Sequence, residues 1–288
     1  MTGVSDSLKS AFRIKKGPSA RIEEEFIHDK SASHIVSNPK PLLKGMGKRF
    51  ELLPIRVSNF DNLLEDHGVE RGMNILVSGG AGTGKTTLAM QSIYFGALAG
   101  EKGVYISFEE DPEKIKYHMK KNFGWDFYEL EKKGLVSIVK FDPAKIARQV
   151  EEVLVKEAGM LRIKVKEMEL PIVPDRIAID SISALAIEFE SEKSYRKYVK
   201  EMFHMLQAYN SVNLIISETE QNPKTYSRTG VEEFVGDGVI VLYNLKIAGV
   251  RKNALEILKM RSGKHSKEMV PYSINEKGIE IFFKEKTF

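Results

Sequence analysis

The segment from residue 79 to residue 86 has the residue types and the spacing best suited to chemistry in this chain. It reads Gly-Gly-Ala-Gly-Thr-Gly-Lys-Thr, which matches the pattern G-x-x-x-x-G-K-[ST]. Glycines in such a loop let backbone N–H groups turn inward around a phosphate. A β-rich run over 74–78 precedes the loop and a helical pattern over 84–99 follows it, as phosphate binding at a helix N-terminus requires. The segment therefore predicts a P-loop that binds ATP with magnesium.

Individual residues of this loop have distinct expected roles. Lys85 is expected to neutralise charge on the β- and γ-phosphates, Thr86 to offer its hydroxyl to magnesium, and Thr87 to reach the α-phosphate. The full set of nucleotide-binding residues predicted in the loop is Gly80, Ala81, Gly82, Thr83, Gly84, Lys85, Thr86 and Thr87.

A carboxylate on the magnesium side is expected at the end of the apolar run 176–180. This run ends in Asp180, 95 residues after Lys85. Asp180 could instead cap a helix, but the serines that follow it, beginning with Ser181, can cap equally well. We therefore expect Thr86 and Asp180 to hold magnesium.

Hydrolysis also needs a group that polarises water opposite the γ-phosphate. The run 104–108 is followed by Glu109 and Glu110, and a carboxylate there would emerge at the carboxyl edge of the sheet, beside the P-loop. Alternatively, these residues and Asp111 begin the next helix, whose positive dipole end favours acidic side chains. We favour a catalytic role, with the choice between Glu109 and Glu110 left open.

A further acidic residue follows another β-rich run. Glu218 comes directly after the run 212–217, where it is placed to sense the γ-phosphate. We expect it to pass that signal to the loop beyond it.

The elements that must position these residues alternate along the chain. Short β-rich runs and longer amphipathic segments predict an α/β fold with a mostly parallel central sheet flanked by helices. Strands are expected at 74–78, 104–108, 135–141, 176–180 and 212–217, and helices at 84–99, 112–122, 143–168 and 193–210. Three later runs, at 239–245, 254–260 and 279–283, have no helices between them, which predicts antiparallel strands at the C-terminal edge.

Composition divides the chain into two parts. Residues 1–48 lack hydrophobic periodicity and are rich in Ser, Lys and Pro, so we expect a flexible N-terminal extension followed by one domain over 49–288. The chain has no cysteine, which excludes disulfides and zinc–cysteine sites. No run approaches the roughly 18 apolar residues of a membrane span. A cytoplasmic location is expected.

The formal net charge of +4 comes from the extension. Residues 1–50 hold 10 Lys and Arg against 5 Asp and Glu, which leaves 34 against 35 for the rest of the chain. The main domain therefore has no overall bias toward polyanions. The extension is most simply a solvated tail, with docking of an unknown protein partner, nucleic acid or a membrane surface as the alternative.

With these motifs in order, the sequence resembles the KaiC-like ATPases of the RecA superfamily over residues 50–285. Besides the P-loop and Asp180, the likeness lies in the stretches 57–64, 107–111, 179–185, 232–240 and 258–265. The P-loop alone fits many ATPases. The paired glutamates and the Lys-x-Arg segment at 259–261 make the match specific.

The resemblance implies a RecA-like P-loop fold and a single KaiC domain of the archaeal type. It implies that Glu109 and Glu110 are paired catalytic carboxylates. It also implies that Lys259 and Arg261 form a basic pair that one subunit inserts toward the γ-phosphate of its neighbour, in a homo-oligomer that is a hexameric ring. Without the resemblance, a charge on a strand is more simply a solvent-facing one.

Some positions depart from the family's pattern. Asn59 and the segment 67–72 stand where relatives usually have more glycine and proline, which affects the expected shape of the adenine side. The namesake clock protein joins two such domains and this sequence shows one. Clock function and autophosphorylation are therefore not implied.

The expected function is magnesium-dependent ATP hydrolysis at subunit interfaces, in a regulatory or partner-remodelling role. One alternative is a RecA/RadA-type recombinase paralogue that binds DNA through the loop 221–230, which contains Lys224, Tyr226 and Arg228. The glutamates that flank this loop and the neutral domain disfavour DNA. Another alternative is an ATP-gated interaction module with little turnover, against which the intact catalytic candidates argue.

Overall fold

The computed structural model describes residues 51–156, 170–221 and 225–285. The expected N-terminal extension, residues 1–48, lies outside the described residues, as does Lys224 of the loop considered for DNA binding. None of the helices in the described ranges combines the length and the apolar character needed to cross a membrane.

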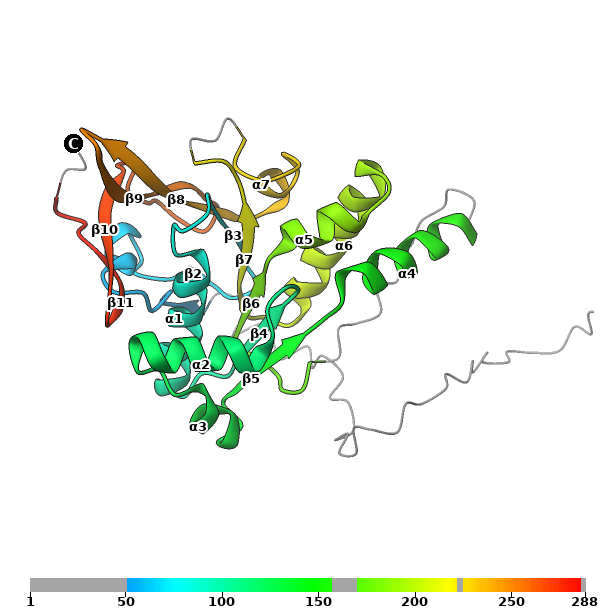
Figure 1. The fold of residues 1–288 in the computed structure, drawn as a ribbon, viewed down its shortest axis with the longest axis horizontal. Helices are drawn as coiled ribbons and strands as arrows, with labels where there is room; N and C mark the ends of the chain where they lie inside the picture. Colours follow the sequence, from blue (N-terminus) through cyan, green and yellow to red (C-terminus); the bar gives the residue numbers. More distant parts are fainter. Residues whose placement is uncertain (1–50, 157–169, 222–224, 286–288) are drawn as a thin grey trace, which may run out of the picture. The chain divides into compact units, whose positions relative to one another are not determined.

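A mixed nine-stranded sheet forms the centre of the described part of the chain, in the order β11-β10-β9-β8-β3-β7-β6-β4-β5 (Figure 1). Six neighbouring strands are parallel: β3 (Asn74–Gly79), β4 (Gly103–Ser107), β5 (Val136–Lys140), β6 (Arg176–Asp180), β7 (Val212–Glu218) and β8 (Gly238–Ile247). Three antiparallel strands extend one side: β9 (Val250–Met260), β10 (Val270–Asn275) and β11 (Gly278–Ile281). The predicted parallel sheet with antiparallel strands at its C-terminal edge is confirmed.

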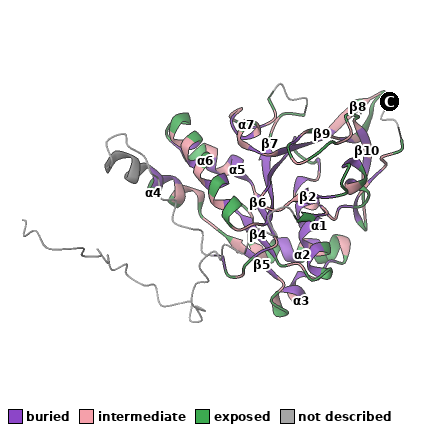
Figure 2. Cartoon of the chain, turned by 180° about the vertical axis from the view of Figure 1, so that it is seen from behind, coloured by how far each residue is buried: buried purple, intermediate pink, exposed green. Residues whose placement is uncertain are grey.

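Helices cover both faces of the sheet. One hydrophobic core contains buried residues of α1 (Lys85–Leu98), α2 (Pro112–Phe123) and α3 (Phe127–Lys132). A second core contains residues of α4 (Pro143–Lys156), α5 (Ile182–Glu188) and α6 (Glu192–Ala208). Because side chains alternate along a strand, Tyr105 of β4 belongs to the first core while Val104 and Ile106 belong to the second. Figure 2 shows the buried residues on the strands and on the helix faces that meet them.

Short elements complete the domain. A two-stranded sheet pairs β1 (Leu52–Leu53) with β2 (Val69–Glu70), and the 3-10 helix η2 (Phe60–Leu63) lies between them in sequence. The four-residue helix α7 (Glu232–Val235) precedes β8.

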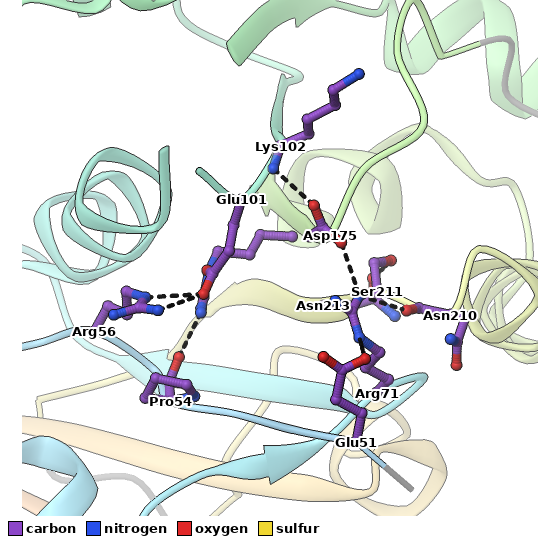
Figure 3. Close-up of polar contacts among 11 residues, drawn as sticks. Glu51, Pro54, Arg56, Arg71, Glu101, Lys102, Asp175, Asn210, Ser211 and Asn213 are labelled. Carbon is purple, nitrogen blue, oxygen red and sulfur yellow. Dashed lines mark hydrogen bonds and ion pairs between the residues drawn. The ribbon is translucent and has the colours of Figure 1, made fainter. Parts of the chain in front are cut away.

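Buried charges connect the segment that contains β1 and η2 to the starts of the parallel strands (Figure 3). The Arg176 side chain at the start of β6 is almost fully buried, ion-pairs with Glu101 and donates to the carbonyl oxygen of Pro54 at 2.6 Å. Arg56 also donates to Glu101, with its Nη2 2.5 Å from Oε1. Burial raises the pKa of Glu101, but the hydrogen bonds from Arg56 and Arg176 outweigh it and hold the pKa below its usual value.

Candidate nucleotide-binding site

The predicted P-loop connects β3 to α1 at the carboxyl edge of the parallel strands, where sheets of this kind bind ligands. Gly84 is the N-cap of α1 with a φ of 86°, and a Cβ there would lie 2.6 Å from the Ile274 side chain. The positive φ favours glycine at this position, whereas movement of the terminal Ile274 methyl would relieve the contact. An α-helix leaves the N–H groups of its first turn without intrahelical partners, so the start of α1, with Thr87 in its first turn, offers donors suited to a phosphate.

Lys85 folds back over the loop. Its ammonium nitrogen donates to the carbonyl oxygens of Gly79 at 2.8 Å and Gly80 at 2.9 Å, and the residue is buried. Burial lowers the pKa of Lys85, and the nearby carboxylates of Glu218 and Asp180 offset this effect in part. A buried cation between carboxylates and a loop of backbone N–H groups suits a polyphosphate with its metal ion.

Two side chains that the sequence did not single out hold other carbonyls of the loop. The Gln221 amide donates to the carbonyl oxygen of Ala81 at 2.8 Å, and the buried Tyr272 hydroxyl donates to that of Thr83. Gln221 follows β7 and Tyr272 lies in β10. Elements distant in sequence therefore hold the loop from outside.

Thr86 and Asp180, the two predicted magnesium-side residues, are in direct contact. The Thr86 hydroxyl donates to Asp180 Oδ2 at 2.6 Å. The Tyr105 hydroxyl donates to the same oxygen at 2.6 Å. Burial raises the pKa of Tyr105 well above its usual value, and the neighbouring Asp180 carboxylate raises it further, so Tyr105 remains a hydrogen-bond donor.

The three consecutive acids after β4 separate in space. Glu109 turns toward Asp180, because its Oε1 accepts a hydrogen bond from the hydroxyl of Ser181 at 3.1 Å. Glu110 turns toward α2 instead, with its Oε1 3.7 Å from the Lys114 ammonium. Asp111 is the N-cap of α2. Glu109 therefore lies beside Asp180, whereas Glu110 and Asp111 contact the next helix, and the catalytic role stays a prediction.

Glu218 lies beside the loop at the end of β7. It is level with Gly79 in the parallel pairing of β3 and β7, and its backbone N–H donates to the hydroxyl of Ser183 at 2.7 Å. Glu218 is exposed and contributes to the electrostatic environment of Lys85. Its expected role toward the γ-phosphate stays a prediction.

Lys259 and Arg261 lie near the amino-terminal ends of β8 and β3, whereas the P-loop follows the carboxyl end of β3. Lys259 on β9 pairs with Val239, which pairs in turn with Leu76 of β3. The Lys259 ammonium donates to the carbonyl oxygen of Gly236 at 2.6 Å, and the Arg261 guanidinium lies 3.1 Å from Asp237 Oδ1.

The distance between these cations and the P-loop of the same chain is large. Asp237, which accepts the Arg261 backbone N–H, donates its own N–H to Asn74 at the start of β3. Gly79 ends that strand, five residues later, or roughly 16 Å at the usual rise of a β-strand. The predicted site residues therefore form two groups, one at each end of the parallel strands.

Comparison with known proteins places this geometry in a family. The family model of the KaiC ATPases matches residues 53–286. A crystal structure of a KaiC-like protein from Pyrococcus horikoshii is 32% identical, with a TM-score of 0.66, and the match covers 81% of this chain and 99% of that one.

Curated proteins give similar matches. The circadian clock oscillator protein KaiC of Synechococcus elongatus is 30% identical over 227 residues, which cover 78% of this chain and 43% of the clock protein. A UPF0273 protein of Aeropyrum pernix is 31% identical over 220 residues, covering 75% of this chain and 87% of that protein. The chain thus spans less than half the length of the clock protein but most of the length of the archaeal relative.

Proposed function

This chain belongs to the KaiC family of ATPases, and from that premise we propose that it hydrolyses magnesium-bound ATP at the interfaces of a ring of identical chains. The observation that carries the proposal is the contact between Thr86 and Asp180 at 2.6 Å, beside the buried ammonium of Lys85. P-loop hydrolases need these three groups at one point, and segments 95 residues apart in sequence supply them. We further propose that turnover regulates the assembly or remodels a partner.

The residues present fit a magnesium ion. Thr86 offers a hydroxyl oxygen and Asp180 a carboxylate, and oxygen ligands from one or two side chains together with substrate phosphates suit Mg²⁺. When bound, magnesium would neutralise charge that develops on the phosphate oxygens.

The chain's own side chains would then divide the work. Lys85 would leave its loop carbonyls and bind the β- and γ-phosphates. Glu109 would orient the attacking water, since its carboxylate lies on the Asp180 side and is exposed. Glu218 would respond to the presence of the γ-phosphate.

Lys259 and Arg261 would act on the site of the neighbouring subunit. Their distance from the P-loop of their own chain leaves action in trans as the way for them to reach a phosphate. A cation supplied in this way stabilises the charge of the transition state. A head-to-tail arrangement that brings one subunit's cations to the next subunit's loop generates a closed ring when the rotation closes.

Calorimetry with ATP tests the binding step. Lys85→Ala removes the main cation facing the β- and γ-phosphates, so ATP affinity in the presence of magnesium should fall at least tenfold, or about 1.4 kcal/mol. Lys114→Ala is a suitable control because Lys114 is an exposed lysine that pairs with Glu110. Unchanged ATP affinity in Lys85→Ala would contradict the P-loop assignment.

The DNA-binding alternative stays a prediction. Within the described part of the loop, Glu233 accepts from the backbone N–H of Tyr226 at 3.3 Å and from the hydroxyl of Ser227. Carboxylates beside the loop oppose a polyanion. We prefer an ATPase that has no nucleic-acid partner. Salt-dependent binding of single-stranded DNA would overturn this preference.

A further inference from the structure

Tyr105 presents a polar group where the core needs none. Its residue is fully buried in the first hydrophobic core, among the side chains that α1 covers. A phenylalanine would fill the same space. Packing alone does not explain the Tyr105 hydroxyl. This hydroxyl donates a hydrogen bond to Asp180 Oδ2 at 2.6 Å.

Strand register brings this hydroxyl to Asp180. β4 and β6 are parallel, with Tyr105 level with Ala178 and Ser107 level with Asp180. Tyr105 and Asp180 therefore lie two positions apart on the same face of adjacent strands, the face that α1 covers. A long side chain such as tyrosine spans such a diagonal.

Two hydroxyls share one oxygen of the carboxylate. Thr86 and Tyr105 both donate to Asp180 Oδ2, each at 2.6 Å, and no hydrogen bond to Oδ1 is found among the described residues. Rotation of the carboxylate would break both bonds. The rotamer of Asp180 is thus determined by groups on two other elements, α1 and β4.

We infer that Tyr105 is a positioning residue for the nucleotide site: its hydroxyl holds Asp180 so that Oδ2 is occupied and Oδ1 is left for the magnesium ion or for water bound to it. This inference rests on the proposed function, because it concerns the ion that accompanies ATP. Residues that orient a metal-binding carboxylate in this way often affect metal affinity almost as strongly as the ligands themselves.

The test separates magnesium from nucleotide. ATP affinity is measured by calorimetry in EDTA and at increasing magnesium concentration, for wild type and Tyr105→Phe. We expect unchanged affinity in EDTA and an approximately tenfold higher magnesium concentration for half of the affinity gain, as is common when the partner of a metal-binding carboxylate is lost.

Tyr195→Phe is the matched control. Tyr195 is also buried and also donates to a carboxylate, Glu232 Oε1, at 2.6 Å, but on α6 and α7. Thermal unfolding should show that both variants fold, and Tyr195→Phe should keep the magnesium dependence of wild type. A merely structural role for Tyr105 would lower the melting temperature in the same way as in the control and leave that dependence unchanged.

A double variant shows whether Tyr105 acts through Asp180. In an Asp180→Ala background, Tyr105→Phe should cause no further change in the magnesium concentration required. An additional change there, or a wild-type magnesium dependence in Tyr105→Phe, overturns the inference while leaving the proposed function intact. Wild type that gains no ATP affinity from magnesium would instead overturn the proposed function, and this inference with it.

Discussion

Glu109, Glu110 and Asp111 are neighbours in the sequence, yet each makes a different contact. Glu109 accepts from Ser181, next to Asp180, whereas Glu110 lies near basic side chains of α2 and Asp111 caps that helix. The strand ends at Ser107, so the alternation of side-chain directions no longer applies to these three residues. Individual contacts, rather than periodicity, decide which of them faces the nucleotide site.

Single substitutions should distinguish the two glutamates. Glu109→Gln keeps the size of the side chain but removes the charge that orients water, so turnover should fall by about 10² or more while ATP still binds. Glu110→Gln should have a much smaller effect, since Glu110 ion-pairs with Lys114 and lies 3.6 Å from His118. Steady-state ATPase rates together with ATP affinities provide the measurement. The reverse order of effects would move the catalytic role to Glu110.

At the scale of residues, short sequence patterns predicted that the P-loop and Asp180 each lie at the end of a strand. The P-loop and Asp180 are recognisable because each adjoins an apolar strand. Tyr105, Gln221 and Tyr272 were missed, because their contacts depend on the register of neighbouring strands and on which strand lies beside the loop. The order of strands in a sheet is not encoded locally.

At the scale of elements, the starts of the parallel strands are held by buried ion pairs. Arg176 on β6 and Glu101 before β4 are both poorly exposed, and Arg56 adds a second cation to the same carboxylate. Removal of one partner leaves an uncompensated buried charge. This cluster joins the segment that contains β1 and η2 to the sheet.

Glu101→Gln should therefore destabilise the domain by about 3 kcal/mol near neutral pH. The folded-state pKa of Glu101 is lowered from its usual 4.5, so its contribution is complete above that value and is lost as the pH falls through the folded pKa. The difference between wild type and variant, measured by urea unfolding, should be largest at neutral pH and shrink below pH 4.5.

An exposed ion pair is the control for this experiment. Glu129 pairs with Lys132 on the surface of α3, and both side chains are more than half exposed. Glu129→Gln should change stability little at any pH, because solvent screens such pairs. An equal effect of the two substitutions would contradict the special role given to Glu101.

Most long periodic elements were predicted to within a few residues and the short ones were not, while residues 157–168 of the helix expected at 143–168 lie outside the described residues. The runs 74–78, 104–108 and 212–217 correspond to β3, β4 and β7. Helix α3, with six residues, is too short to show a hydrophobic period. Strand β10 contains Pro271, a residue that argues against a strand when the sequence is read alone. It is the second residue of β10, and the pairing of β10 with β9 covers only Val270 and Pro271.

At the scale of the whole molecule, the two groups of site residues lie at opposite ends of the parallel strands. Lys259 and Arg261 are held by α7 and the residues around it, near the start of β3, while the P-loop follows the end of β3. Each complete site would then need two chains, and ATP bound between them should stabilise the oligomer.

Mixing two inactive variants tests this arrangement. Arg261→Ala should lower turnover by about 10³, as loss of a cation supplied in trans does. Glu109→Gln/Glu110→Gln chains keep Arg261, so mixed assemblies contain interfaces with one intact carboxylate site and one intact cation. Some activity should therefore return on mixing.

Arg251→Ala provides the control for the loss of an arginine from β9. The Arg251 guanidinium donates to the carbonyl oxygen of Asn244 in the β8–β9 hairpin, and the variant should keep its activity. Native mass measured with ATP and magnesium shows whether the chains co-assemble. Mixed assemblies that stay inactive, or a protein that remains monomeric with ATP, would contradict action in trans.

The separation of the P-loop from Lys259 and Arg261 also determines how many complete sites an open or a closed assembly contains. A two-fold axis pairs one patch with the other patch of the copy and the reverse, so a dimer joined in that way is already closed, whereas head-to-tail contacts build a row that closes only as a ring. A row of copies joined through these patches has a free end on each side, so it always contains one site fewer than it has chains. Closure removes both ends and makes the numbers equal. The ratio of complete sites to chains therefore reports directly whether the row has closed.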